Sequence, residues 1–558
     1  MEQDNSVQAA PEQTIKEGPG SMIPQFALKR PMLTMLSVLS AAILLMLLWW
    51  QPKNIGLRWP LSVSVVGLTL MFNALIEGQK PRPTSIILFL ITQGLSLIPC
   101  FRTEINTVSI SVFATIICLL LLVSDFLNGQ WWQYRLREHF KTWFVSIPAF
   151  FIGLPVLASI AARSRKARTL DEDRKKIGLG VLKGVLIALP LLLIFIFLFS
   201  SADLVFKNKV SGFVDWLRND SFRDLFGRAM LTLLFAIIAG AGLFLTFATH
   251  TKKPQFEPDK PLVKAFLGMT ETTIVLVSIN LLFAFFLIIQ FKYFFGGAAN
   301  IHGAGFTYAD YARKGFNELL TVAALAGLLY FGLGSSTRRE TGKQKLTFSL
   351  LGGLMLAQVG VVLVSAYLRI NLYIAKYGLT EIRLIPKIFI FYLAAILVSL
   401  VIMEARGRFK RLALVLLTAL ILFSLTLAVV NIDKTIARTN IERAIQGEKL
   451  DYYLLKNRLS IDVVPYLYQL LDSKSLSPEQ TDNLAKVLVC RSFSRDAVDE
   501  DLTWLDWNNS WSQANAAHSR HTDLRKQYPF EPTTNGYDDG FKIDGTWFSC
   551  RYHQDPSD

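Results

Sequence analysis

The chain has 558 residues, of which 52% are hydrophobic and only 18% are charged. Soluble domains carry about 25% charged residues, so this composition argues against an ordinary soluble enzyme. The formal net charge of +15 is uneven, because residues 1–430 carry +20 and residues 431–558 carry −5. Basic loops between apolar segments are typical of membrane proteins beside anionic lipid, and we therefore expect no nucleic-acid partner.

Apolar runs of about 20 residues recur along the chain, which is the length that a helix needs to cross a bilayer. The strongest runs are residues 33–50, 177–199, 226–248, 273–295, 348–368, 385–403 and 412–430. Further candidates are residues 61–76, 84–99, 108–126 and 143–161. We predict an all-α polytopic transmembrane helix bundle of about 11–12 helices, with the lipid bilayer as its partner.

The sequence divides into four parts. Residues 1–30 are polar and lack the apolar core and cleavage site of a signal peptide, so we expect the run 33–50 to be a retained anchor. Residues 31–162 hold the N-terminal transmembrane helices, and residues 163–430 hold a core of repeated hairpins. Residues 431–558 are predicted to form a small soluble α+β tail.

Basic loops predict the orientation of the helices. The connections 163–176, 249–264, 335–345 and 404–411 are basic, and we expect all four to face the cytoplasm. The loops between them then face outward. Because the run 412–430 leads away from the cytoplasm, the tail of this multi-pass membrane protein is predicted to be extracytoplasmic.

The parity of crossings depends on residues 143–161. Pro148 and Pro155 interrupt the hydrogen bonding of a straight helix in this run, so it is our candidate for a re-entrant or interfacial segment. That assignment predicts eleven crossings with the N-terminus inside. The alternative is twelve crossings with the N-terminus outside.

Residues 163–430 show a weak repeat of a two-helix unit. Its outer corners contain an acid at 200–203, at 305–313 and at 378–383, and the second and third corners share a Gly, a Thr, an acid and an Arg. The order of elements predicts tandem hairpins of parallel orientation rather than an inverted-repeat transporter.

Polar residues at these corners and at the start of the tail form the candidate binding site on the outer face. They are Asp203, Tyr308, Asp310, Arg313, Glu318, Glu381, Arg383, Asp433 and Arg438. One interpretation is a polar binding site or a proton-linked switch. The other is that the acids, Asp433 among them, cap helices while the cations and tyrosines anchor the interface.

The tail carries three local signals. Trp504, Trp507 and Trp511 have a spacing that would place three indoles on one helical stripe. Residues 541–548 have the signature of a tight β-hairpin around Asp-Gly. Cys490 and Cys550 could pair if the tail lies in an oxidising compartment.

Motifs for known chemistry are not found. The sequence contains no phosphate-binding Gly-rich loop with Lys and Ser or Thr, no HExxH and no paired CxxC. His518 and His521 with the tail cysteines are spaced irregularly for a metal site. We therefore assign no catalytic residue, no metal and no cofactor.

Four segments carry a resemblance to a known family: SADLVF at 201–206, FTYADYARKGF at 306–316, YGLTEIR at 377–383 and NIDKTIARTN at 431–440. In this order they resemble the bacterial membrane family called domain of unknown function four-one-seven-three, which is similar to its neighbour four-one-five-three. The resemblance covers about residues 180–470 and implies a bacterial cytoplasmic membrane. It supplies no activity or catalytic residue.

Three hypotheses for function follow. The first is a non-enzymatic envelope protein that binds, senses or scaffolds, with an envelope protein or a small molecule as its partner. It is motivated by a sizeable outside tail next to an outer acidic cluster. The alternatives are a secondary transporter of a small solute, which the number of helices favours, and a lipid-linked envelope enzyme.

Overall fold

The computed structural model is almost entirely helical. It describes residues 28–166, 220–251, 266–295, 316–406, 411–473, 475–493, 503–531, 540–543 and 546–550. The predicted crossing at 177–199 lies outside these residues.

Within the described part of the chain, ten helical segments are long and apolar enough to cross a membrane. They are α1 (Pro31–Trp49), α2 (Arg58–Ile76), α3 (Pro83–Ser96) continued by α4 (Ile98–Phe101), α5 (Ile105–Asp125), α9 (Asp220–Thr251), α10 (Met269–Phe295), α13 (Phe316–Ser336), α14 (Gly342–Tyr377), α15 (Glu381–Ala405) and α16 (Leu412–Val430). The prediction of an all-α polytopic bundle is confirmed.

These helices expose apolar side chains in a way that only lipid tolerates. Leu68 on α2, Leu281 on α10 and Val398 on α15 are 69%, 66% and 58% exposed. A helix that is apolar on its outer face as well as its inner face is typical of a membrane span. The chain is therefore a multi-pass membrane protein.

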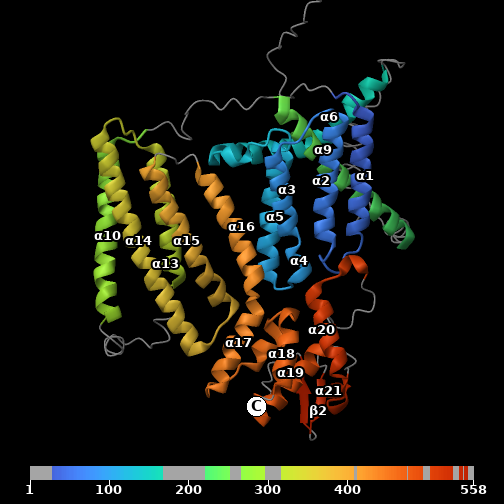
Figure 1. Ribbon diagram of the computed structural model, residues 1–558, viewed down its shortest axis with the longest axis vertical. Coiled ribbons are helices and arrows are strands. Elements are labelled where there is room, and N and C mark those ends of the chain that lie inside the picture. The colour runs from blue at the N-terminus through green and yellow to red at the C-terminus, as the bar shows by residue number, and fades with distance from the viewer. Residues whose placement is uncertain are drawn as a thin grey trace, which may run out of the picture.

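The bundle has two different ends (Figure 1). One end carries the C-terminal tail, and we call it the tail end. The opposite end, here the basic end, holds the short connections from α2 to α3, α5 to α6, α13 to α14 and α15 to α16. Their described cations are Lys80, Arg82, Arg135, Arg338, Arg339, Arg406 and Arg411.

Helix α9 runs from the tail end to the basic end. Near its start, the Arg228 guanidinium lies 5.0 Å from the ring centroid of Trp50, which follows α1. Near its other end, the Thr246 hydroxyl donates to the Val123 carbonyl in the last turn of α5, at 2.8 Å. Helix α5 therefore ends, and helix α9 begins, at opposite ends of the bundle.

Helix α6 (Leu136–Lys166) takes a different course from its neighbours. Its apolar part, Ser146–Ala162, is shorter than the ten candidate spans and contains Pro148 and Pro155. In Figure 1 the teal α6 runs across the blue helices near the basic end instead of along them. The non-spanning assignment of this segment stays a prediction, which this course favours.

Two large cores lie inside the described part of the bundle. The first joins α1, α2, α3, α5, α6 and α9 through side chains such as Leu70, Leu122 and Leu157. The second joins α10, α13, α14 and α15 through side chains such as Tyr330 and Met355. Helix α16 stands between the two groups and contributes Leu417 to the first core and Leu412 to the second.

The tail is a compact set of short helices with a small sheet. Its elements are α17 (Ile432–Ile445), η3 (Leu454–Arg458), η4 (Ile461–Val463), α18 (Val464–Asp472), α19 (Pro478–Phe493), η5 (Trp504–Asp506), α20 (Asn509–Arg520), α21 (Thr522–Gln527), β1 (Phe530–Glu531), β2 (Gly540–Ile543) and β3 (Thr546–Ser549). The strands form an antiparallel sheet in the order β1-β2-β3, in which Phe541 pairs with Phe548. The predicted hairpin and the α+β tail are confirmed.

A disulfide joins α19 to the residue after β3, because Cys490 and Cys550 are bonded to each other. Cys490, Phe541 and Phe548 share a small buried core with Tyr528. The covalent link and this core fix the sheet against α19.

The predicted stripe of three tryptophans is wrong. A capping box of Thr503 and Asp506 closes the short turn η5, and the Asn508 side chain then accepts from the Ser510 and Trp511 amides to begin α20. Trp504 therefore lies in η5 and Trp511 in α20, so the three indoles do not share one helix. Spacing alone could not reveal a helix that stops and restarts, because Thr and Asn form local caps wherever the chain turns.

Candidate functional site

The tail and the membrane helices share one hydrophobic core. Leu384 of α15 and Leu427 of α16 are buried with Ile436 of α17, Leu455 of η3 and Leu467 of α18. Because α17 begins at Ile432, directly after α16 ends at Val430, no flexible linker separates the two parts. The tail is thus fixed to the bundle, and the junction between them is the candidate site.

A buried ion pair anchors the tail to the start of α2. Arg58 Nε donates to Asp506 Oδ1 at 2.9 Å, and Arg58 Nη2 donates to Asp506 Oδ2 at 3.1 Å. Their side chains are 3% and 0% exposed. The guanidinium also donates to the Leu48 carbonyl at the end of α1. Burial alone would raise the pKa of Asp506, but hydrogen bonds from Arg58 and Thr503 hold it well below its usual range.

A second set of contacts joins the tail to the end of α4. The Thr103 amide donates to the Asp462 carboxylate at 3.0 Å, and Asn508 Nδ2 donates to the Pro99 carbonyl at 2.6 Å. Ser510 Oγ donates to the Phe101 carbonyl at 2.9 Å. These bonds occupy backbone groups at the end of a helix that would otherwise lack partners. Together with the Arg58–Asp506 pair they form what we call the docking interface.

Three acids meet beside the docking interface, and we call Glu104, Glu381 and Asp433 the carboxylate cluster. Glu104 caps α5 by accepting from the Asn106 and Thr107 amides, each at 2.7 Å. The Asn106 side chain bridges two acids, because its Nδ2 lies 2.8 Å from Glu104 Oε1 and 2.9 Å from Glu381 Oε2. Glu104 and Asp433 are 1% and 0% exposed.

Asp433 has the most unusual electrostatic surroundings in this cluster. Burial, together with the charges of Glu381 and Glu104, raises its pKa from 3.8 to about 7, although a hydrogen bond from the Ser460 amide at 2.6 Å opposes the shift. Among the described residues its Oδ1 has no hydrogen-bond partner. The cluster can therefore take up a proton close to neutral pH.

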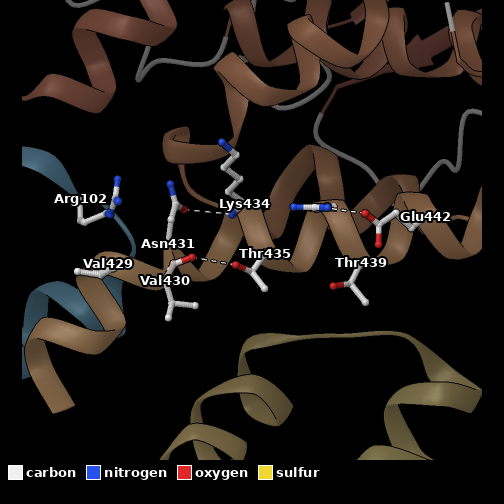
Figure 2. Close-up of a pocket in the computed structure, with 9 residues that line it drawn as sticks. Arg102, Val429, Val430, Asn431, Lys434, Thr435, Thr439 and Glu442 are labelled. Atoms are coloured by element: carbon white, nitrogen blue, oxygen red, sulfur yellow. Dashed lines mark hydrogen bonds and ion pairs between the residues drawn. The ribbon is translucent and has the colours of Figure 1, made fainter. Parts of the chain in front are cut away.

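Next to the cluster, an open groove of about 520 Å³ follows the exposed side of α17. Figure 2 shows its lining, and we call it the interfacial groove. The lining residues are Arg102, Val429, Val430, Asn431, Lys434, Thr435, Arg438, Thr439 and Glu442. Three cations and one anion face this space, so it suits an anionic ligand.

The residues predicted for the outer site fall into different places. Asp203, Tyr308, Asp310 and Arg313 lie outside the described residues. Glu318 is exposed in the first turn of α13, which is also at the tail end of the bundle. The remaining four lie at the tail end, at or near the junction.

Of these four, Glu381 and Asp433 come together in the carboxylate cluster, whereas Arg438 lines the groove and pairs with Glu442 at 2.7 Å. Arg383 donates to the Tyr377 carbonyl at 2.9 Å, so it caps the end of α14. One interpretation of the sequence makes Asp433 a helix cap, but Asn431 caps α17 instead by accepting from the Lys434 amide. A single site made of all nine residues stays a prediction.

Sequence reasoning missed several residues of the junction. Glu104 stands directly before an apolar helix, a position where an acid can accept free amides, and this signal could have identified it. Arg58 and Asp506 carry no local signal, because their importance arises only when residues 448 positions apart meet.

The tail histidines do not form a metal site with the tail cysteines. The cysteines are bonded to each other, and Tyr468 Oη lies 2.8 Å from His518 Nδ1. Burial and the nearby cations Arg525 and Arg491 lower the pKa of His518 to about 4. In the described ranges no three His, Cys, Asp or Glu side chains are grouped so that they could hold a metal ion.

Comparison with known proteins adds one match. No curated protein and no solved structure matches the chain. A family model described as Domain of unknown function (DUF4153) matches residues 87–470, from the beginning of α3 to α18. The sequence motifs resemble first the neighbouring family four-one-seven-three and cover about residues 180–470, whereas the matching model is that of four-one-five-three and begins at residue 87. The matched region includes both the carboxylate cluster and the groove, and it covers well over half of the chain, which therefore belongs to the DUF4153 family.

Proposed function

We propose that this is a non-enzymatic protein of a bacterial cytoplasmic membrane that presents its folded tail at the extracytoplasmic surface for binding, sensing or scaffolding. The observation that carries this proposal is the continuous core between the tail and the membrane helices, sealed by the buried Arg58–Asp506 pair. A tail held this rigidly keeps one fixed orientation above the membrane. Rigid presentation favours recognition, because little ordering entropy is lost on binding.

Two features support an extracytoplasmic tail. Disulfides persist in oxidising compartments, and the tail contains the Cys490–Cys550 disulfide, whereas Cys100 and Cys118 in the bundle are free and buried. The described short connections at the opposite end are basic, as cytoplasmic loops commonly are. Both features favour the same orientation.

Crosslinking in intact cells tests the proposal. A photoreactive side chain replaces Asp523, which is 92% exposed on the tail, in the full-length chain. We expect one discrete adduct with an envelope component, and we expect Asp506→Asn to weaken it by undocking the tail. The same probe at the exposed Lys343 on the basic end is the control.

An adduct that forms equally from Lys343, or the lack of any adduct from several exposed tail positions in a folded protein, contradicts the proposal. A component crosslinked only from the tail, and lost on undocking, supports it. The chemical identity of the crosslinked component then distinguishes the two roles: a protein indicates scaffolding, and a small molecule indicates sensing.

A secondary transporter is the second candidate, and Asp433 favours it. A buried carboxyl group with a pKa of about 7, next to two further acids at the ends of three membrane helices, is a common feature of proton-linked transport. Solute flux into proteoliposomes that is driven by a pH gradient and abolished by Asp433→Asn would support this candidate. Absence of flux across a broad panel of solutes, with the fold intact, would count against it.

A further inference from the structure

We infer that the interfacial groove binds the phosphate group of an anionic phospholipid, whose acyl chain lies along α16. This inference depends on the membrane embedding of the chain and goes beyond the proposed role of the tail. The ligand chemistry is a phosphate diester with a negative charge, and its source is the surrounding bilayer.

The groove lies at the level where lipid headgroups are found. Val429 and Val430 are the last residues of the span Leu412–Val430, and Arg102 directly follows the span Pro83–Phe101. Both spans end at the tail end of the bundle. The polar part of the groove therefore begins where the apolar parts of two neighbouring helices stop.

Three residues with nitrogen donors line the groove beside the start of α17. Figure 2 shows the side chains of Arg102, Asn431 and Lys434 extending toward the same side of this helix. The Asn431 side-chain oxygen accepts from the Lys434 amide at 3.1 Å, which leaves its Nδ2 as a donor toward the groove. Two cations and an amide are a suitable set of donors for phosphate oxygens.

The position of Arg102 is fixed, whereas Lys434 can adapt. Arg102 Nε donates to the Ala428 carbonyl at 2.7 Å, so the guanidinium is held against the end of α16. Lys434 is exposed, and its ammonium lies 5.8 Å from the centroid of the Tyr466 ring. A rigid guanidinium beside a flexible ammonium can bind headgroups of slightly different shape.

An apolar track leads from the groove into the membrane. Leu422, Leu425 and Val429 are 49%, 38% and 80% exposed. Their spacing of three and four residues places them on one stripe of α16 that ends at the groove. A lipid chain on this stripe would place its phosphate beside Arg102 and Lys434, whereas a free phosphate would leave the stripe unused.

The charge balance also favours an anion. Arg102, Lys434 and Arg438 oppose the single acid Glu442 in the groove. Arg438 and Glu442 form an exposed pair, with side chains 67% and 54% exposed, and such pairs exchange partners at little cost. Arg438 can therefore turn from Glu442 to the ligand.

Native mass spectrometry of the delipidated full-length protein tests the inference. The probes are phosphatidylglycerol, phosphatidylcholine, glycerophosphate and inorganic phosphate. We expect phosphatidylglycerol to bind most tightly. Lys434→Gln and Arg438→Gln should each weaken its binding about five-fold, as expected for one cation near a membrane surface. Glu442→Gln should strengthen its binding, because the competing anion is removed.

Lys449→Gln is the matched control, since it removes an exposed charge from the tail outside the groove. Val429→Gln should weaken phosphatidylglycerol but not glycerophosphate, because only the former has an acyl chain. Equal binding of the two lipids, or an equal loss in Lys449→Gln, overturns the inference. Inorganic phosphate that binds as tightly as phosphatidylglycerol with the same dependence on Lys434 identifies a free anion and also overturns it.

Discussion

Arg58 and Asp506 are 448 residues apart in the chain, yet they form a two-pronged ion pair with side chains only 3% and 0% exposed. One belongs to the first turn of a membrane helix and the other to a short turn of the tail. Their contact is buried inside the docking interface. It makes the tail a structural continuation of the bundle.

Asp506→Asn should therefore release the tail from the bundle. Removing one partner of a buried pair leaves the other charge uncompensated, which costs about 3–5 kcal/mol. We expect faster proteolysis of the tail and a lower apparent melting temperature of the purified full-length protein in detergent.

The exposed pair of Arg438 and Glu442 is the matched control for this prediction. Arg438→Gln should change stability by less than about 1 kcal/mol, because exposed pairs contribute little. If Asp506→Asn were as stable as Arg438→Gln, the docking interface would not depend on the buried pair.

Asp433 should make the junction sensitive to pH. Its pKa rises from 3.8 to about 7 in the folded protein, so the folded state holds a proton that the unfolded state has released. The resulting stabilisation is complete below about pH 3.8, decreases as the pH rises and is lost above about pH 7. At about 1.4 kcal/mol per pKa unit the whole effect is roughly 4 kcal/mol.

Thermal melting of the wild type and Asp433→Asn at pH 5 and pH 8 measures this effect. The wild type should lose stability between the two values, whereas Asp433→Asn should lose much less, because Asn keeps an acceptor for the Ser460 amide and carries no charge. Parallel changes in the two proteins would show that Asp433 does not titrate in this range.

The disulfide should stabilise the tail and leave the bundle unaffected. Cys490 and Cys550 are separated by 60 residues. Closing a loop of that length lowers the entropy of the unfolded chain, which stabilises the folded state by about 4 kcal/mol. Cys490→Ser combined with Cys550→Ser should expose the region around α19 to proteases. Reduction of the wild type should reproduce the effect, while the double variant should not respond to reductant. If neither the double substitution nor reduction of the wild type changed the rate of tail proteolysis, this role would be contradicted.

Gly378 should be required at the corner between α14 and α15. Its φ of +77° is left-handed, and an added Cβ would lie 2.6 Å from Asn440 Oδ1, which accepts from the Leu379 amide. Gly378→Ala should therefore cost more than backbone strain alone, which is about 1–3 kcal/mol.

Gly447 provides the control, because its φ is +97° but an added Cβ would meet no atom within 4 Å. Gly447→Ala should show the strain without the clash. Melting temperatures of the two variants should rank Gly378→Ala lower. The reverse order would show that the α14–α15 corner can move away from α17.

The membrane helices could be predicted because their signal is local. An apolar run such as 412–430 is stable as a helix in lipid, whatever the rest of the sequence is. Helix α16 has these same bounds. The polar ends of these helices are harder to predict. Helix α14, for example, begins at Gly342 and ends at Tyr377, well beyond the apolar run 348–368. Capping and tertiary contacts, rather than hydropathy, set the ends of that helix.

The junction could be predicted only in part. Glu381 and Asp433 were identified because acids at helix ends in an apolar chain are conspicuous. Their partner Glu104 and the Arg58–Asp506 pair were not identified, because contacts between distant segments leave no periodic pattern in one sequence. Corners at 200–203 and 305–313 lie outside the described residues, and their role stays a prediction.

The side of the membrane that the tail faces is the central claim, and labelling of intact cells tests it most directly. Cysteine replaces Asp523 on the tail or Lys343 on the basic end, in chains that keep the buried Cys100 and Cys118. A membrane-impermeant maleimide should label Asp523→Cys in whole cells, and Lys343→Cys only after lysis. Labelling of Lys343→Cys in whole cells, with Asp523→Cys protected until lysis, would contradict the account.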